Sequence, residues 1–193
     1  MHLNRRVANF GVVITQLGRG SHVEPRVVAG LDENRLTGYA GLPLNHNPYT
    51  NEFQEPLLAA GALSPARGDY AVVFDSAARS GAGSFTFRFW VNDVRPPTLR
   101  LTSRAVARGR PLRIAATDAG AGVCASSIVA LVDGEQARAS YRGATISVPT
   151  GGLSAGTHQL RVRASDYQEA KNTENVARIL PNTRTLTVTF RVR

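Results

Sequence analysis

The strongest constraint on the fold is an alternation of apolar and polar side chains along short segments, which is clearest in residues 84–92. The apolar members of this segment fall at every second position: Phe85, Phe87, Phe89 and Val91. A period of two places such residues on one face of a β-strand, so the segment is predicted to be a half-buried strand. Trp90 falls on the other face, where it would either fill a domain junction or mark a local bulge.

The second half of the chain repeats this pattern in short runs separated by turn residues. Residues 156–164 and 184–193 carry apolar side chains at alternate positions. Asp133 and Gly134 are a strong hairpin signal, because glycine takes a positive φ without steric cost. About seven strands in roughly 95 residues is the spacing of a β-sandwich of the immunoglobulin or fibronectin type. We therefore predict an all-β protein of two tandem β-sandwich domains, the second immunoglobulin- or fibronectin-like.

A stiff connector divides the chain near its middle. Residues 92–97 end in two prolines, which lack a backbone N–H and hold the chain extended. We therefore predict an N-terminal sandwich over residues 1–94, with a long irregular loop at about 42–68, and a C-terminal sandwich over residues 95–193. Within the first domain, residues 57–63 could form one short helix.

The chain has a formal net charge of +9, and all of its 23 basic residues except Lys171 are arginine. The arginines are scattered over many segments, whereas a nucleic-acid site would gather them on one element with aromatic residues between them. We interpret the charge as a solvated basic surface, which disfavours nucleic acid as a partner. The alternative is that the charge serves adhesion to an acidic cell-wall polymer or to nucleic acid. A protein substrate is a further possible partner if the chain is a substrate-docking module.

No motif of catalytic chemistry is recognisable. The four histidines stand apart from any serine or cysteine motif of nucleophilic catalysis, and His158 is predicted to be an exposed strand residue. The single cysteine, Cys124, excludes an intrachain disulfide and is predicted to be a small buried or semi-buried residue. We therefore predict that the chain is not an enzyme, has no catalytic residues and needs no organic cofactor.

Neither a membrane span nor an export signal is predicted. The apolar runs are far shorter than the ~18 residues that a bilayer-spanning helix needs. Residues 7–17 are interrupted by polar side chains and lack a small-residue cleavage site, so we interpret them as a strand rather than a signal peptide. If the domains work outside the cell, the export information lies elsewhere, and the chain would be the tail of a longer one.

Three aspartates are candidate calcium ligands. Asp93 lies in the connector, Asp118 in a glycine turn, and Asp166 at the start of a long polar loop. The segments of Asp93 and Asp118 resemble the calcium-binding linkers between cadherin repeats, where three carboxylates neutralised by Ca²⁺ stiffen a domain junction. The alternative is a plain turn role for Asp118 and a capping or strand-end role for Asp93.

Two long irregular segments, 42–56 and 166–182, are where a binding surface is expected, because long loops on compact sandwiches are usually functional or packed against a neighbour. Aromatic side chains in or near these segments are the candidates for contact with a ligand. They are Tyr49, Phe53, Trp90 and Tyr167.

Three stretches resemble the region that follows the catalytic domain in some actinobacterial subtilisin-like serine proteases. They are residues 41–45 with 47–49, residues 85–93, and residues 165–175 with 180–183. The resemblance implies a secreted bacterial parent and a protease catalytic domain as partner, in cis or in trans. The chain would then be a non-catalytic spacer, substrate-docking module or wall-binding module. The family's Gly-Thr-Ser-Met-Ala type segment, which holds its catalytic serine, is missing here, so no catalytic residue is carried over.

Two other functions stay open at this stage. One is a stand-alone extracellular adhesion or carbohydrate-binding protein of immunoglobulin-like fold, with Ca²⁺ at the domain junction. The other is a hydrolase of unknown type.

Overall fold

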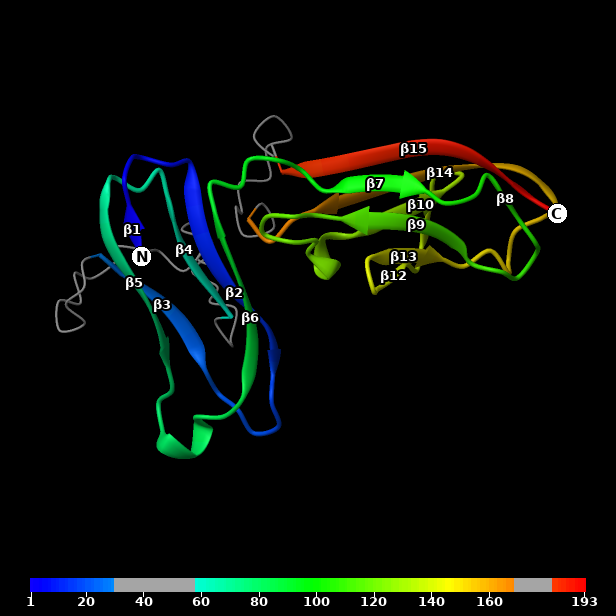
Figure 1. Ribbon diagram of the computed structural model, residues 1–193. Helices are drawn as coiled ribbons and strands as arrows, with labels where there is room; N and C mark the ends of the chain where they lie inside the picture. Colours follow the sequence, from blue (N-terminus) through cyan, green and yellow to red (C-terminus); the bar gives the residue numbers. More distant parts are fainter. Residues whose placement is uncertain (30–57, 169–181) are drawn as a thin grey trace. The chain divides into compact units, whose positions relative to one another are not determined.

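The structure is a computed structural model that describes residues 1–29, 58–168 and 182–193 (Figure 1). The described residues belong to two compact units, the first reaching Val94 and the second beginning at Arg95. In these ranges the only helices are two 3-10 turns, η1 (Arg79–Gly81) and η2 (Ala125–Ser127). All other regular elements are β-strands, which confirms the predicted all-β fold class.

The first unit is a sandwich of two antiparallel sheets. Its strands are β1 (His2–Leu3), β2 (Asn9–Leu17), β3 (Glu24–Ala29), β4 (Ala59–Leu63), β5 (Gly68–Asp75) and β6 (Phe85–Val91). One sheet has the strand order β1-β5-β3 and the other has the order β4-β2-β6. The connection between β5 and β6, which contains η1, runs from one sheet to the other at one end of this unit (Figure 1).

Both sheets of the first unit contribute side chains to one core. Phe10 and Val12 of β2 are fully buried and pack in one cluster with Val27 of β3 and Tyr70 of β5. The ring of Phe10 meets the ring of Tyr70 edge-on, with 5.1 Å between the centroids. Each sheet therefore buries one face against the other, which is the packing of a sandwich.

The alternating strand predicted at 84–92 is β6, and its apolar face points between the sheets. Phe85 and Phe87 contact Phe74 of the opposite sheet, with ring centroids 4.7 and 4.8 Å apart. These rings are less buried than the pattern predicts, since Phe87 is 50% exposed and Phe89 is 40% exposed. The reason is their position, because β6 is the outermost strand of its sheet in the described part of the chain.

Trp90 lies on the opposite face of β6 and is buried. It is paired with Gly11 of β2, and a Cβ at Gly11 would collide with the six-membered ring of the indole. The glycine therefore creates the space that the indole fills. The register of this strand pair shifts between Ile14 and Gln16, so the bulge that was one explanation for Trp90 does not lie at that residue.

The helix considered at 57–63 is not formed in the described part of that segment, residues 58–63, where a strand, β4, stands instead. Its residues Ala59 and Gly61 pair with Val13 and Gly11 of β2. Alanine and leucine are good helix formers, but the preference is worth less than about 1 kcal/mol per residue, and pairing with a buried neighbouring strand outweighs it.

The second unit has the strand order of an immunoglobulin fold. Its strands are β7 (Thr98–Leu101), β8 (Ala105–Val106), β9 (Leu112–Thr117), β10 (Val129–Val132), β11 (Glu135–Ala137), β12 (Ser140–Arg142), β13 (Thr145–Val148), β14 (Gly156–Ser165) and β15 (Thr183–Val192). The two sheets have the orders β12-β13-β9-β7 and β11-β10-β14-β15-β8. With β7, β9, β10, β13, β14 and β15 as strands A, B, C, E, F and G, one sheet contains A, B and E and the other contains C, F and G.

The predicted turn and the predicted strand faces of this unit are confirmed. Asp133 and Gly134 have φ values of 52° and 91°, as a tight hairpin between β10 and β11 requires. On β14, Leu160 and Val162 are fully buried, and on β15 Phe190 is buried against the same cluster. The alternate residues of both strands consequently point to solvent.

Candidate functional site

The outer face of the five-stranded sheet carries two neighbouring arginines from β14. Arg161 and Arg163 are exposed, and they pair across the ladder with Thr187 and Thr185 of β15. Residues two apart on a strand lie about 7 Å from each other on the same face, so the two guanidinium groups start side by side. Exposed hydroxyl groups from β15 line one side of this pair.

Neither arginine has an acidic neighbour in the strand register. On the side away from β15, β10 places Leu131 beside Arg161 and Val129 beside Arg163. The ion pairs found among the described residues include neither of them. Exposed guanidinium groups of this kind bind carboxylate, phosphate or sulfate oxygens through two parallel hydrogen bonds.

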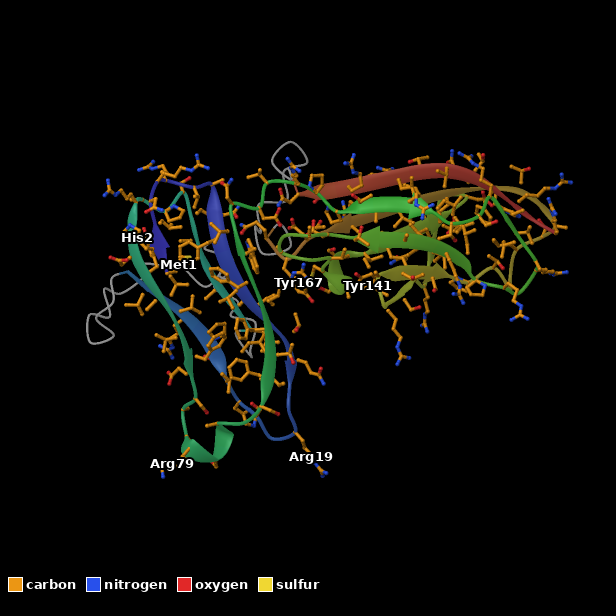
Figure 2. All side chains as sticks on the ribbon, viewed as in Figure 1. Met1, His2, Arg19, Arg79, Tyr141 and Tyr167 are labelled. Atoms are coloured by element: carbon orange, nitrogen blue, oxygen red, sulfur yellow. The ribbon has the colours of Figure 1, made fainter. Side chains whose placement is uncertain are left out.

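The other exposed arginines of the described strands do not repeat this spacing: Arg184 and Arg191 share β15 but lie far apart along it. On the second sheet of this unit, Arg100 belongs to β7 and Arg113 to β9, and both are exposed. In the first unit, Arg19 and Arg79 project at the end where η1 lies (Figure 2). The basic charge is thus dispersed over the described surface, as predicted, and Arg161 with Arg163 differ by sharing one face of one strand.

A histidine and an aspartate form an ion pair where the hairpin turn after β10 meets β14. Nδ1 of His158 lies 2.6 Å from Oδ2 of Asp133, and Nε2 lies 2.9 Å from the carbonyl oxygen of Ser154. Both partners accept hydrogen bonds, so both ring nitrogens donate. The ring therefore has no lone pair left for general-base catalysis.

The same contacts shift both titrations. The hydrogen bond to Asp133 raises the pKa of His158 above its ordinary value, and the bond to the Ser154 carbonyl adds to this. The backbone N–H of Gln159, followed by the His158 side chain, lowers the pKa of Asp133. The pair is therefore charged on both sides over a wide range of pH.

The prediction of an exposed His158 is wrong, since the residue is 8% exposed. Its ring lies 5.6 Å from that of Phe190, measured between centroids. The physical reason is the alternation of β14, which puts His158 on the same inward face as Leu160. That signal was present in the sequence.

Two of the three predicted calcium ligands lie close together in the second unit. Carboxylate oxygens of Asp118 and Asp166 come within 4.8 Å of each other. Oδ1 of Asp118 accepts the backbone N–H of Gly122 at 2.7 Å, which closes the glycine turn. Oδ2 of Asp166 accepts a hydrogen bond from Asn182 at 2.6 Å, and the Asp166 side chain is buried.

The third predicted ligand, Asp93, belongs to the first unit. Its backbone N–H donates to Oδ1 of Asn9 at 2.9 Å, and its carbonyl oxygen accepts Nδ2 of Asn9 at 2.7 Å. The asparagine thereby holds the chain in place just after β6 ends. Calcium binding by Asp93, Asp118 and Asp166 stays a prediction.

The predicted aromatic surface is only partly within the described residues. Tyr49 and Phe53 lie outside them. Trp90 is 3% exposed and its indole packs against Gly11. A binding role for it stays a prediction. Tyr167 is partly buried in the second unit, where its backbone N–H donates to the Gly122 carbonyl (Figure 2).

Two further observations concern the cysteine thiol and membrane insertion. Cys124 is buried at 5% exposure, and its Sγ lies 3.1 Å from Oγ of Ser126. Neither short helix of the described ranges has the length and apolar character to cross a membrane.

Comparison with known proteins yields only distant structural likenesses. No protein family and no curated protein matches the sequence. Among solved structures, the fibronectin(III)-like modules of CbhA from Clostridium thermocellum align at 14% identity and a TM-score of 0.35, covering 100% of this chain and 82% of that one. Murine CEACAM1b aligns at 11% identity and a TM-score of 0.33, covering 100% and 89%. The fold assignment accordingly rests on the strand order described above.

The pair of arginines on β14 is not among the residues predicted as a site from the sequence, where the arginines form a scattered set. The signal for it was the two-residue spacing of Arg161 and Arg163 within an alternating strand. The absence of an acidic partner in the described ladder depends on which strands flank β14, and the sequence of one strand does not reveal its neighbours.

Proposed function

We propose that this chain is a non-catalytic accessory module of a secreted subtilisin-like serine protease, and that its second unit associates with acidic polymers of the cell wall. The observation that carries the proposal is the pair of exposed arginines, Arg161 and Arg163, on one face of β14. A polymer with repeated phosphate or carboxylate groups has the charge and spacing to engage both guanidinium groups.

A non-catalytic role is supported by the polar groups of the second unit. Both ring nitrogens of His158 are engaged with acceptors, and Cys124 is buried. The buried apolar residues of the second unit form the core between its two sheets. The outer faces of the sheets are therefore the surfaces that a partner can contact. The protease parent rests on the resemblance of residues 85–93 and 165–175 to the region behind such catalytic domains.

The wall-binding role is tested with poly(glycerol phosphate), measured by calorimetric titration of the full chain. Charge reversal in Arg161→Glu/Arg163→Glu should weaken binding at least about tenfold, because it removes two phosphate contacts and adds repulsion. The matched control is Arg100→Glu/Arg113→Glu, which changes the net charge equally but on the other sheet. This control should bind within about threefold of the parent chain. An equal loss in both variants would show that only net charge matters.

The parent is tested separately. We expect the coding sequence of this chain to lie beside, or in frame with, one for a subtilisin-like catalytic domain. The isolated chain should not hydrolyse casein. Casein hydrolysis that survives further purification would contradict the non-catalytic assignment.

A further inference from the structure

One edge of the first unit is only partly covered by its neighbouring strand. β1 pairs with β5 at two positions, His2 with Asp69 and Leu3 with Gly68. Just beyond them, the backbones of Met1 and Tyr70 exchange two hydrogen bonds of 2.8 Å each. Among the described residues, no strand pairs with residues 71–75 of β5 on this side.

Within the described ranges, no strand engages the hydrogen-bonding groups of the β5 backbone along that edge. The N–H and C=O of a strand residue point to the same side, and successive residues alternate. The backbone N–H and C=O of Tyr70 point towards β1, and the register of β5 with β3 has no shift. The backbone N–H and C=O of Val72 and Phe74 therefore point to the same edge. Pro25 of β3 stands opposite Phe74. Because proline has no backbone N–H, it fits a ladder position only where it need not donate a hydrogen bond to the neighbouring strand.

The same opening exposes an apolar stripe on the facing sheet. On β6, Phe87 is 50%, Phe89 40% and Val91 41% exposed, although all three point to the inside of the sandwich. Phe74 touches the ring of Phe87 across the opening, so the edge of β5 and the stripe on β6 border one space. Exposed apolar stripes beside an unpaired strand edge are characteristic of sites of strand addition.

We propose that this edge binds an extended segment of a partner protein as an added β-strand, antiparallel to β5 and in continuation of the β1 ladder. Residues directly opposite in an antiparallel pair share a face, so the partner residues opposite Val72 and Phe74 place their side chains inward against Phe87 and Phe89. They are therefore apolar, and polar residues alternate with them. The ladder register selects a polypeptide, because only a strand supplies donors and acceptors at this repeat. The inference goes beyond the proposed function and does not depend on it.

The test uses a seven-residue peptide of alternating valine and threonine, with a lysine at each end, added to the full chain. Amide hydrogen exchange followed by NMR should slow at Val72 and Phe74 by at least about tenfold, because the added strand accepts their N–H groups. Exchange at Ala71 and Val73, whose backbone groups already face β3, should not change. Peptide N-methylated at its valines should lose binding, whereas peptide N-methylated at its threonines should retain it.

A pair of variants separates the apolar stripe from general effects on folding. Phe87→Ser should weaken binding of the unmodified peptide at least about tenfold, and Thr86→Ser, on the opposite face of β6, should not. Equal loss after either N-methylation, or unchanged exchange at Val72 and Phe74, would overturn the proposal. So would a concentration-dependent dimer of the free protein that protects the same two amides, because a second copy would then be the occupant.

Discussion

The indole of Trp90 lies against the backbone of Gly11, its partner across the β2–β6 ladder. The other neighbour of Gly11 in the ladder is Gly61 of β4, so neither residue carries a side chain on this face. Gly11 thus provides the backbone surface on which the only tryptophan of the chain rests.

This contact predicts the cost of adding a methyl group. Gly11→Ala should destabilise the first unit by about 1–3 kcal/mol, because the new Cβ displaces the indole from a packed position. Urea unfolding followed by circular dichroism measures this. In a Trp90→Val background the same alanine should cost clearly less, since the ring is gone. An equal cost in both backgrounds would mean that another contact is responsible.

The pair of Asp133 and His158 predicts a pH window of added stability. A raised histidine pKa contributes stability below the ordinary value of 6.5, and this is lost as pH rises through the folded value. A lowered aspartate pKa contributes stability above the ordinary value of 3.8, and this is lost as pH falls through the folded value. The pair therefore stabilises the second unit most between these two ordinary values.

The variant Asp133→Asn tests this window, because asparagine can still accept the Gln159 N–H at this position. The difference in Tm between the parent chain and this variant should be largest near pH 5 and should shrink towards pH 9 and pH 3. Glu135→Gln, in the next strand, is the matched control and should give a flat difference. A difference for Asp133→Asn that grows above pH 7 would contradict the assignment.

The buried hydrogen bond between Asn182 and Asp166 predicts a loss of stability without any change of surface. Nδ2 of Asn182 donates to Oδ2 of Asp166, and both residues are buried. Asn182→Ala should cost about 1–3 kcal/mol, because a buried carboxylate loses a donor. Thr185→Ala, an exposed change on β15, is the control and should be nearly neutral in urea unfolding. A neutral Asn182→Ala variant would show that the carboxylate is satisfied without this donor.

Calcium addition tests the predicted ligands directly. The carboxylates of Asp118 and Asp166 come within 4.8 Å of each other, and two such groups attract a hard cation that accepts oxygen ligands. At a Kd of about 1 mM, about 5 mM Ca²⁺ should add roughly 1 kcal/mol and raise Tm by about 4 °C. The rise should disappear in Asp118→Asn, and Asp93→Asn tests the third ligand that the sequence predicts. Absence of heat in calorimetric titration would remove the site.

Much of the fold was predictable because strand alternation is a local property. The inward faces of β6, β14 and β15 follow from residues two apart, and the hairpin at Asp133 and Gly134 follows from the positive φ that glycine permits. The inward position of His158 follows the same alternation, although the residue was predicted to be exposed. These features need no knowledge of any other part of the chain.

The sequence by itself thus determined the all-β class, the strand faces and the tight turn, because each depends on neighbours within a few residues. Only the tertiary structure decided which strands became edges, and so why Phe87 is half exposed while Trp90 is buried over Gly11. It also decided that Asp133 meets His158 and that no acidic side chain flanks Arg161 in its ladder. Such relationships depend on pairing between distant segments, and that pairing is settled by the summed packing of the whole unit.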